Sequence, residues 1–330
     1  MDNFLYATDL GKYYVGKSEK ILTSNIGKEL KNKVQLIITS PPFPLNKKKR
    51  YGNLKGEEYK EWFVSFAELF SELLTDDGSI VLELGNSWEP YRPVQSVLQM
   101  ESLLAFLKSP KADLRLCQEF ICYNPSRIPS PAQWVTINRI RTVDSFTRVW
   151  WMSKTDYPKA DNQKVLRPYS KSMKNLLKRQ SYNSGKRPSE HNVSETGFLK
   201  DHNGSIMPNV IELEPSDEKK ELRLPFNLFS MANTNSNDFF SKTCREREIQ
   251  LHPARMKAEL ASFFIEFLTD SNDLVLDPFA GSNTTGFCAE KLGRRWIAVE
   301  VEEKYGYQSA IRFEDPSIET NLIMKNKTQT

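Results

Sequence analysis

Apolar and polar positions follow two alternating periods in the first third of the chain, and these periods predict strands and a helix in turn. Residues 34–39 form a short β-branched apolar run that two prolines end, which is typical of a buried strand. Apolar side chains recur at helical spacing over residues 57–74, and residues 79–84 are apolar again. This part therefore predicts a strand, a helix and a second strand, with a turn at residues 76–78.

The last third of the chain repeats this pattern. Helical spacing over residues 260–267 precedes an apolar run at 274–277, a loop rich in small residues, a helix from about Thr284 and a further strand at 296–301. Alternating strands and helices predict a doubly wound α/β fold with a mostly parallel sheet covered on both faces. Residues 201–248 are polar and lack either period, so the middle of the chain is interpreted as an inserted region.

Composition narrows the class of protein. The chain has 330 residues, of which 39% are hydrophobic and 27% charged, so it can bury a substantial core. We expect neither a membrane span nor a secretion signal, because apolar runs are short and the first residues lack a basic stretch. The four cysteines and three histidines are scattered without metal-ligand spacing, which favours a cytoplasmic protein without a metal site.

The net charge of +4 matters mainly through its distribution. Residues 154–191 hold ten Lys or Arg and three acidic residues, interleaved with tyrosines, and a second basic run occupies residues 47–50. Such clusters suit either a solvated loop face or a surface that neutralises nucleic-acid phosphates. Composition alone leaves both interpretations open.

A phosphate-loop pattern is present near the start. Gly11 is followed after four residues by Gly16-Lys17-Ser18, which matches the loop of nucleotide triphosphatases. The intervening Lys-Tyr-Tyr-Val segment is more typical of a strand than of a turn, and the strand at 34–39 ends in Thr-Ser rather than in an Asp that could hold magnesium. A P-loop NTPase is therefore kept only as an alternative.

The segment from Asp277 to Gly286 predicts a strand-to-helix turn that can hold an anionic or adenosine-containing ligand. Small residues let the backbone approach the ligand, and the helix N-terminus offers free amides. Glu300 lies twenty-three residues beyond Asp277, near the end of the next strand, where a carboxylate can accept hydrogen bonds from both ribose hydroxyls. The alternative is an ordinary tight turn with a solvated Glu.

A second candidate site follows the strand at 34–39. Ser40, Pro41, Pro42 and Phe43 combine a hydroxyl, a rigid loop with directed carbonyls, and an aromatic ring. The serine and a carbonyl can accept hydrogen bonds from the exocyclic amine of a flipped base while the ring stacks on it. A plain proline turn at a strand end is the alternative.

These two motifs, in this order, carry a family resemblance. The chain resembles the S-adenosylmethionine-dependent DNA amino methyltransferases of the permuted β order, in which the catalytic motif precedes the cofactor motif. The resemblance extends over nearly the whole chain through six further segments, which are Arg50-Tyr51-Gly52-Asn53, Asn124-Pro125-Ser126, Val149-Trp150-Trp151, Ser153-Lys154-Thr155, Gly204-Ser205-Ile206 and His252-Pro253-Ala254-Arg255.

The resemblance implies a Rossmann-like methyltransferase core with an inserted target-recognition region. It places the catalytic part at 1–154, the recognition region at 155–250 and the cofactor-binding part at 251–330. The implied cofactor is S-adenosyl-L-methionine, and its implied site residues are His252, Pro253, Asp277, Pro278, Phe279, Gly281, Ser282, Asn283, Thr284 and Glu300. Relatives usually carry an Asp at the position of Lys17, so contacts with the adenine of the cofactor are the weakest part of this comparison.

The implied reaction is methyl transfer to the N4 amine of cytosine in duplex DNA by base flipping. A carbon-5 enzyme would need a cysteine, typically after a proline, and no cysteine here follows one. An exocyclic amine needs positioning rather than a covalent intermediate. Adenine N6 is the nearest alternative, and a non-catalytic DNA-binding protein is a more distant one.

Ser40, Pro41, Pro42 and Phe43 would act on the base. Glu83, an acid in an apolar strand, is either a proton acceptor or a structural carboxylate. We expect double-stranded DNA as the partner, with a companion restriction endonuclease if the protein belongs to a restriction-modification system. The candidate DNA contacts are Lys47, Lys48, Lys49, Arg50, Arg167, Lys171, Lys174 and Arg187.

Overall fold

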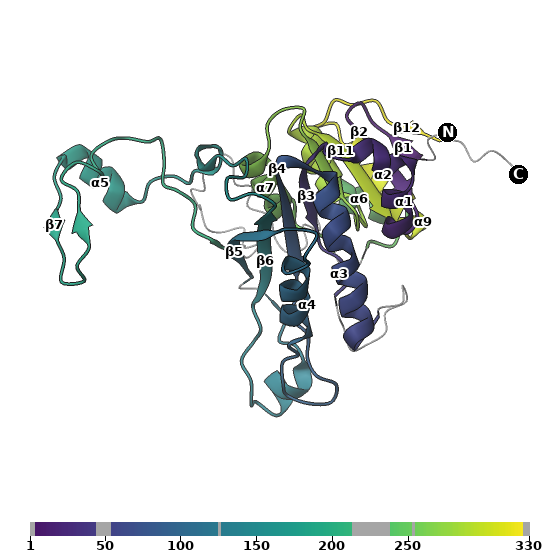
Figure 1. Ribbon diagram of the computed structural model, residues 1–330, viewed down its shortest axis with the longest axis horizontal. Coiled ribbons are helices and arrows are strands. Elements are labelled where there is room, and N and C mark those ends of the chain that lie inside the picture. Colours follow the sequence, from purple (N-terminus) through teal and green to yellow (C-terminus); the bar gives the residue numbers. More distant parts are fainter. Residues whose placement is uncertain (1–3, 44–53, 125–126, 213–237, 253–254, 326–330) are drawn as a thin grey trace, which may run out of the picture.

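A ten-stranded sheet forms the centre of the molecule. The computed structural model describes residues 4–43, 54–124, 127–212, 238–252 and 255–325 (Figure 1). In spatial order the strands are β12 (Ile323–Met324), β1 (Phe4–Ala7), β2 (Gly11–Val15), β11 (Arg295–Glu300), β10 (Leu274–Asp277), β3 (Val34–Thr39), β4 (Leu74–Leu84), β6 (Phe146–Ser153), β5 (Arg115–Tyr123) and β9 (Val210–Glu212).

The middle of this sheet is parallel. Strands β2, β11, β10, β3 and β4 pair in parallel, whereas β1, β12, β6 and β5 are added antiparallel. The carboxyl ends of the five parallel strands therefore meet at one edge, where α/β proteins bind their ligands. The expected doubly wound, mostly parallel fold is confirmed.

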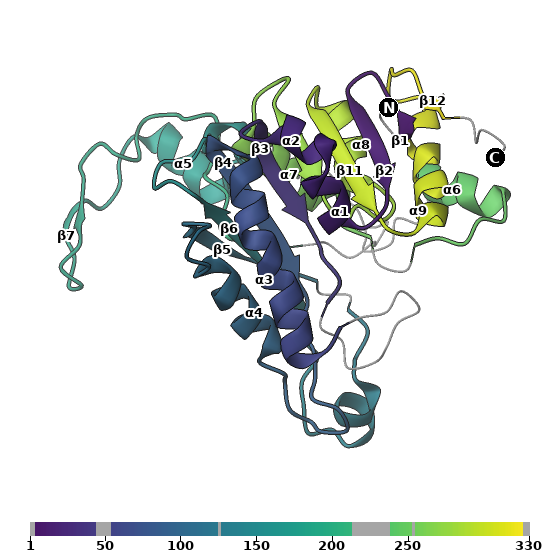
Figure 2. The same cartoon turned by 45° about the vertical axis from the view of Figure 1, so that its right-hand side comes forward.

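Helices cover both faces of the sheet (Figure 2). One core lies under α1 (Ser18–Thr23), α2 (Asn25–Leu30), α3 (Gly56–Leu73) and α4 (Leu98–Leu107). The other lies under α7 (Ala258–Leu268) and α8 (Thr284–Lys291), with α9 (Glu303–Ala310) and the 3-10 turn η3 (Ile311–Glu314) beside them. No helix of the described ranges has the length and apolarity needed to cross a bilayer.

The hydrophobic pattern explains the central elements. All six side chains of β3 are buried, with Leu36 and Ile38 in one core and Ile37 in the other, because helices cover both of its faces. The turn expected at residues 76–78 is instead part of β4. The pairing of β3 with β4 shifts register there, from Leu74 opposite Val34 to Ser79 opposite Leu36, so the chain bulges without leaving the sheet.

The middle of the chain divides into parts with different attachments. Residues 166–206, here called the arm, project beyond β5 and carry α5 (Lys171–Arg179) and the hairpin of β7 (Gly185–Lys186) and β8 (Asn192–Val193) (Figure 1). Before the arm, η2 (Asn162–Val165) packs against α7. After it, β9 joins the central sheet, and α6 (Phe239–Glu246) packs against η3. The full extent of the recognition region, 155–250, stays a prediction.

Candidate active site

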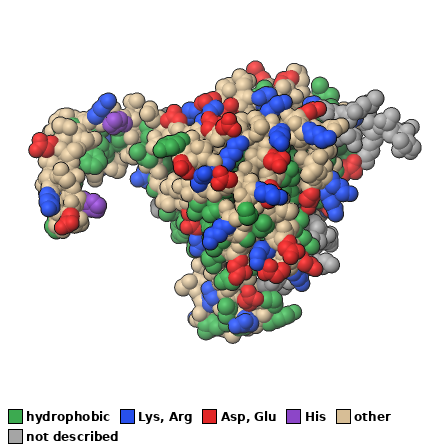
Figure 3. Space-filling model, in the orientation of Figure 1, with side chains coloured by type: hydrophobic (Ala, Val, Ile, Leu, Met, Phe, Trp, Pro, Cys, Tyr) green, Lys and Arg blue, Asp and Glu red, His purple; other side chains and the backbone are tan. Residues whose placement is uncertain are grey.

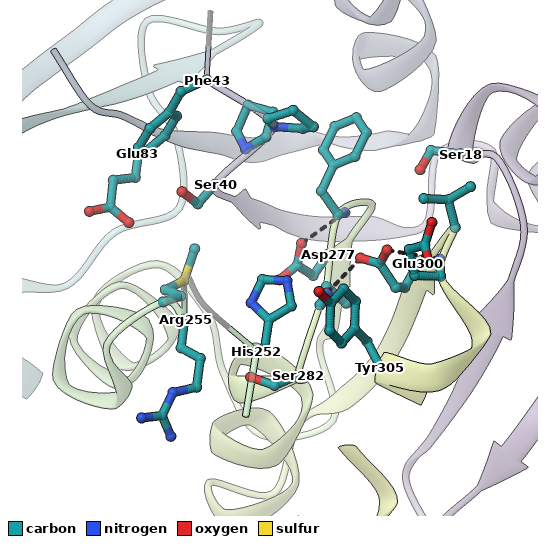
Figure 4. A pocket seen from close by; sticks show the side chains of 18 of the residues that line it. Ser18, Ser40, Phe43, Glu83, His252, Arg255, Asp277, Ser282, Glu300 and Tyr305 are labelled. Carbon is teal, nitrogen blue, oxygen red and sulfur yellow. Dashed lines mark hydrogen bonds between the residues drawn. The ribbon is translucent and has the colours of Figure 1, made fainter. Parts of the chain in front are cut away.

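A cavity of about 500 Å³ opens at the carboxyl edge of the parallel strands (Figure 4). Its volume is in the range typical of small-molecule sites. It brings together residues that the sequence placed in two motifs at opposite ends of the chain, because β3 lies beside β10 in the sheet. The predicted residues that line it are Ser40, Pro41, Pro42, Phe43, Glu83, His252, Asp277, Phe279, Gly281, Ser282, Thr284 and Glu300.

Two predicted residues lie behind the lining. The Pro278 carbonyl accepts a hydrogen bond from the Ser18 hydroxyl, which holds the start of α1 against the loop. Asn283 is fully buried in the left-handed conformation (φ 51°), where it caps α8 by accepting from the Gly286 amide at 3.0 Å. Asn tolerates this conformation, so the helix keeps its start without a glycine at this position.

The remaining predicted residues lie away from the cavity or outside the described structure. Arg167, Lys171, Lys174 and Arg187 belong to the arm and do not line the cavity. Lys47, Lys48, Lys49, Arg50 and Pro253 lie outside the described residues.

Asp277 is held at the end of β10 by three donors. The Thr39 and Thr285 hydroxyls donate to its two carboxylate oxygens at 2.6 and 2.7 Å, and the Phe279 amide donates at 3.1 Å. Burial nevertheless raises the pKa of Asp277 to about 6, because these hydrogen bonds offset only part of the desolvation of the carboxylate. The Thr39 bond also joins the strand of the first motif to the strand of the second.

Glu300 and Gly281 are hydrogen-bonded to each other in the same part of the cavity as Asp277. The Glu300 carboxylate accepts from the Gly281 amide at 2.9 Å and from the Glu302 amide at 3.0 Å, and burial raises its pKa. Gly281 has φ +50°, and a Cβ there would approach the His252 ring to 3.3 Å. The ring of His252 in turn meets Tyr305 edge to face at 4.2 Å. The loop is thus shaped for close approach of a ligand to its backbone.

Sequence reasoning missed the residues that brace this loop from below. The buried Arg312 donates to the Ser282 carbonyl at 2.6 Å and to the Thr284 hydroxyl at 3.2 Å. The Tyr13 hydroxyl donates to the Gly281 carbonyl at 2.8 Å. Arg312 belongs to no local motif, and Tyr13 lies in the phosphate-loop pattern, which gives no reason to expect this contact. The sequence offers one signal, which is that Arg312 lies between the apolar residues Ile311 and Phe313, where a charged side chain needs a buried partner.

Tyr13 also explains the phosphate-loop pattern. Its segment is strand β2, which pairs with β1 on one side and β11 on the other, so its amides are engaged in the sheet. A phosphate loop would leave those amides free to cradle a phosphate. The geometry therefore excludes the NTPase alternative.

Aromatic side chains form the wall beside α3. Trp62 packs against Phe279 with ring centroids 5.5 Å apart, and its indole NH donates to Glu19 at 2.5 Å. Lys17 and Glu19 both line the cavity, and Glu19 does so at the end that Trp62 forms. This end offers flat apolar surfaces with a carboxylate beside them, which suits a planar heterocycle.

The first motif supplies the opposite side of the cavity. Ser40 follows the end of β3 and lies near Glu83 of the neighbouring β4, and Phe43 lies above them (Figure 4). Phe43 packs so closely on Gly85 that a Cβ there would lie 2.6 Å from its ring. Sequence reasoning missed Gly85, although a glycine directly after a strand is a known sign of close packing.

Glu83 is half-buried and surrounded by polar partners. The Thr147 hydroxyl donates to it at 3.0 Å. Burial raises the pKa of Glu83, and the Thr147 and Ser40 hydroxyls and the Lys257 and Arg127 charges offset part of that rise. Burial also lowers the pKa of Lys257. A carboxylate with a raised pKa beside Ser40 suits proton transfer.

These residues can support the direct transfer of a group between two bound ligands, rather than catalysis through a nucleophilic side chain. None of the described residues lining the cavity is a cysteine. The arrangement instead offers two binding surfaces that face one another, one with carboxylates at strand ends and one with a hydroxyl, a ring and a half-buried acid.

Comparison with known proteins adds to this geometry. The profile of a family described as DNA methylase matches residues 34–310. The type II methyltransferase M.PvuII of Proteus hauseri is 38% identical over 96% of this chain and 88% of its own length. The type II methyltransferase M.BglII of Bacillus subtilis is 22% identical over 83% of this chain and 62% of its own length.

Solved structures agree with the fold. A PvuII DNA methyltransferase described as cytosine-N4-specific superimposes with a TM-score of 0.71 at 33% identity, covering 96% of this chain and 91% of that one. A putative DNA modification methylase of Thermus thermophilus, complexed with S-adenosyl-L-methionine, superimposes with a TM-score of 0.51 at 16% identity, covering 91% and 92%.

Proposed function

The chain belongs to the DNA methylase family, and from that premise we propose that it transfers a methyl group from S-adenosyl-L-methionine to the N4 amine of cytosine in duplex DNA. One observation carries the proposal. The Ser40–Phe43 loop and the Asp277–Glu300 side, far apart in sequence, face each other across one cavity. The similarity over nearly the full length to M.PvuII and to a cytosine-N4-specific structure supports N4 of cytosine over N6 of adenine.

The cavity fits the cofactor. Each Glu300 oxygen accepts one backbone hydrogen bond and keeps a lone pair for a ribose hydroxyl. The left-handed Gly281 leaves space that a side chain would fill, and Trp62 and Phe279 offer flat surfaces for the adenine. His252, Asp277, Ser282 and Thr284 also line the cavity. S-adenosyl-L-methionine, when bound, supplies an electrophilic methyl group on its sulfonium.

The residues of the first motif would orient the target amine. Ser40 and the Pro41 carbonyl accept hydrogen bonds from the N4 amine, which turns its lone pair out of conjugation with the ring and toward the cofactor side. Phe43 stacks on the flipped cytosine, and Pro42 fixes the loop. Glu83, half-buried beside Ser40, takes up the proton that the amine loses after transfer.

DNA contacts outside the cavity are part of the same proposal. Arg167, Lys171, Lys174 and Arg187 of the arm, together with Lys47, Lys48, Lys49 and Arg50, would neutralise phosphates of the duplex. We also propose that the enzyme acts in the cytoplasm and protects DNA from a companion restriction endonuclease, as the similarity to type II methyltransferases supports.

The test is to incubate the protein with isotopically labelled S-adenosyl-L-methionine and mixed-sequence duplex DNA, digest the DNA to nucleosides and identify the labelled one by mass spectrometry. Labelled N4-methylcytosine is the expected result, and sequencing of the modified DNA then maps the target site. Labelled N6-methyladenine would overturn the choice of base, and absence of label from DNA would overturn the proposed activity.

A further inference from the structure

Two loops leave the sheet at the same edge as the cavity. Residues 85–97 connect β4 to α4, and residues 124 and 127–145 are the described part of the connection from β5 to β6. Their roots are close to the site, because Glu83 and Thr147, which both line the cavity, lie within three residues of the loop ends. Figure 1 shows both loops projecting together at the lower end of the molecule, and we call them the tip.

The tip is held together by contacts between its two loops. The Asn86 amide donates to Asp144 at 2.9 Å. The Arg141 guanidinium lies 3.9 Å above the Trp88 ring and donates to the Pro93 carbonyl at 2.7 Å. These contacts cross from one loop to the other, so the two loops of the tip form one structural unit.

The surface of the tip is unusually apolar. Seven of the nineteen large hydrophobic side chains that are exposed among the described residues belong to it. Ile137 is the last residue of the short helical turn η1 (Gln133–Ile137) and Ile140 follows it, and the two are 67% and 60% exposed. Hydrophobic side chains gather at this lower end in Figure 3. Exposed apolar groups concentrated on one projection indicate a contact surface.

Its charge indicates what that surface contacts. The described residues of the tip hold four arginines, Arg92, Arg127, Arg139 and Arg141, and two acids, of which Asp144 is engaged by Asn86. Within the described part of the chain, no hydrogen bond or ion pair engages the side chains of Arg92 and Arg139. Arginines beside isoleucines suit duplex DNA, since guanidinium groups bind phosphates and apolar wedges enter between bases.

The arm does not offer the same position. Strand β6 runs from Phe146 at the edge of the cavity to Ser153, which pairs with Ser79 near the opposite edge. The chain therefore starts toward the arm from the side of the sheet away from the cavity. Of these two projections, only the tip begins where a flipped base would enter.

We propose that the tip enters the duplex beside the extruded cytosine, with Ile137 and Ile140 against the bases left behind and Arg92 and Arg139 on the phosphates. This inference rests on the proposed function and deepens it by naming the element that stabilises the opened duplex. Extrusion breaks stacking and pairing, which costs a few kcal/mol, and apolar contact with the disrupted stack offsets part of that cost.

The test compares two substrates with the mapped site, a fully paired duplex and one with an abasic position opposite the target cytosine. For the variant I137A/I140A we expect kcat/KM on the paired duplex to fall about tenfold or more, which corresponds to losing part of the extrusion energy. On the abasic substrate, where pairing is already absent, we expect a fall of about twofold or less. The control is I323A, because Ile323 on β12 is 59% exposed at the far end of the sheet.

Equal losses of kcat/KM on both substrates, or no loss on either, would overturn this role of the tip. The proposed function would still stand in that case, provided that the wild type methylates DNA. If the wild type methylates no DNA, the proposed function fails. The contact between the tip and DNA is then tested by measuring how tightly the protein binds a fluorescent mixed-sequence duplex. R92A/R139A should weaken binding and reduce its salt dependence by about two phosphate contacts, and an unchanged salt slope would overturn the DNA contact.

Discussion

The two sides of the cavity are built in different ways. On the cofactor side, Asp277, Gly281 and Glu300 lie at strand ends and in one tight loop, and their polar atoms are engaged from below by Thr39, Tyr13 and the neighbouring amides. On the base side, Ser40 and Phe43 belong to a proline loop, and the Phe43 ring packs closely on Gly85. The cofactor side is thus preorganised by hydrogen bonds, and the base side by shape.

This difference predicts that the two sides fail differently when altered. Changes on the cofactor side should alter stability and cofactor affinity, whereas changes on the base side should alter the rate of transfer with little effect on either. The Thr39–Asp277 hydrogen bond is a direct side-chain link between the two strands concerned. Substitutions on each side can therefore show whether that link couples them.

The largest effect is expected for Ser40→Ala. Loss of the hydroxyl removes one of the two acceptors proposed to orient the amine, and loss of one positioned polar group of this kind costs about 10²–10³-fold in rate. Cofactor affinity should stay unchanged, because Ser40 lies on the base side. Single-turnover transfer and calorimetric binding of S-adenosyl-L-methionine measure the two quantities, and full activity would remove Ser40 from the reaction.

Asp277→Asn tests the stability of the cofactor side. Because the pKa of Asp277 rises from 3.8 to about 6 on folding, the folded state binds more protons than the unfolded state between those values, and stability falls as pH rises. The cost reaches about 3 kcal/mol above pH 6 and is absent below about pH 4. The variant should therefore gain free energy of unfolding relative to wild type as pH rises from 4 to 7, measured by urea denaturation.

Asp270→Asn is the matched control for that series. Its carboxylate pairs with Lys164 at 2.5 Å and with Lys159 at 3.3 Å, and these ion pairs lower the pKa of Asp270. The control should thus show a small slope of the opposite sign, because the exposed charge is favoured by folding. A pH-independent difference for Asp277→Asn would contradict the raised pKa.

These examples show how much of the site the sequence predicts. The strand, turn and helix from Asp277 to Thr284 are contiguous, so the cofactor side could be recognised from spacing, as could Ser40 to Phe43. The central strands were predictable because β-branched runs buried on both faces carry a strong signal.

The remaining features depend on contacts between distant residues. Arg312 acts on Ser282 thirty positions away, and Arg141 holds Trp88 across two loops. Neither contact leaves a local pattern. The basic cluster at 154–191 is contiguous in sequence and therefore indicates a candidate surface on the arm. The apolar tip forms only when the chain folds and two separate loops meet.

Glu83→Gln separates a proton acceptor from a structural carboxylate. Because burial raises the pKa of Glu83, we expect the single-turnover rate of the wild type to fall with decreasing pH at values above the ordinary range of a glutamate. The variant should lose this acidic limb and transfer about tenfold or more slowly at neutral pH. A variant that keeps the same limb would make Glu83 structural.

Glu300→Gln tests the cofactor side without altering the base side. The glutamine side chain has one oxygen that accepts and an NH2 group that only donates, so it loses the hydrogen bond from either the Gly281 or the Glu302 amide as well as a charge-assisted bond to the ribose. We expect the Kd for S-adenosyl-L-methionine to rise about tenfold. The rate at saturating cofactor should stay within about twofold of wild type if the two sides are independent, and the exposed Glu319→Gln serves as control.

The smallest effect is expected for Gly85→Ala, and it tests the role of shape most directly. The new methyl group would lie 2.6 Å from the Phe43 ring, which must move because Gly85 directly follows the last residue of β4 and its backbone is held there. We expect kcat/KM for DNA to fall about threefold to tenfold, with cofactor affinity unchanged. If displacement of the ring is the whole cause, Gly85→Ala should have no further effect in a Phe43→Ala background, whereas additive losses would show that Gly85 acts on the base side through something other than Phe43.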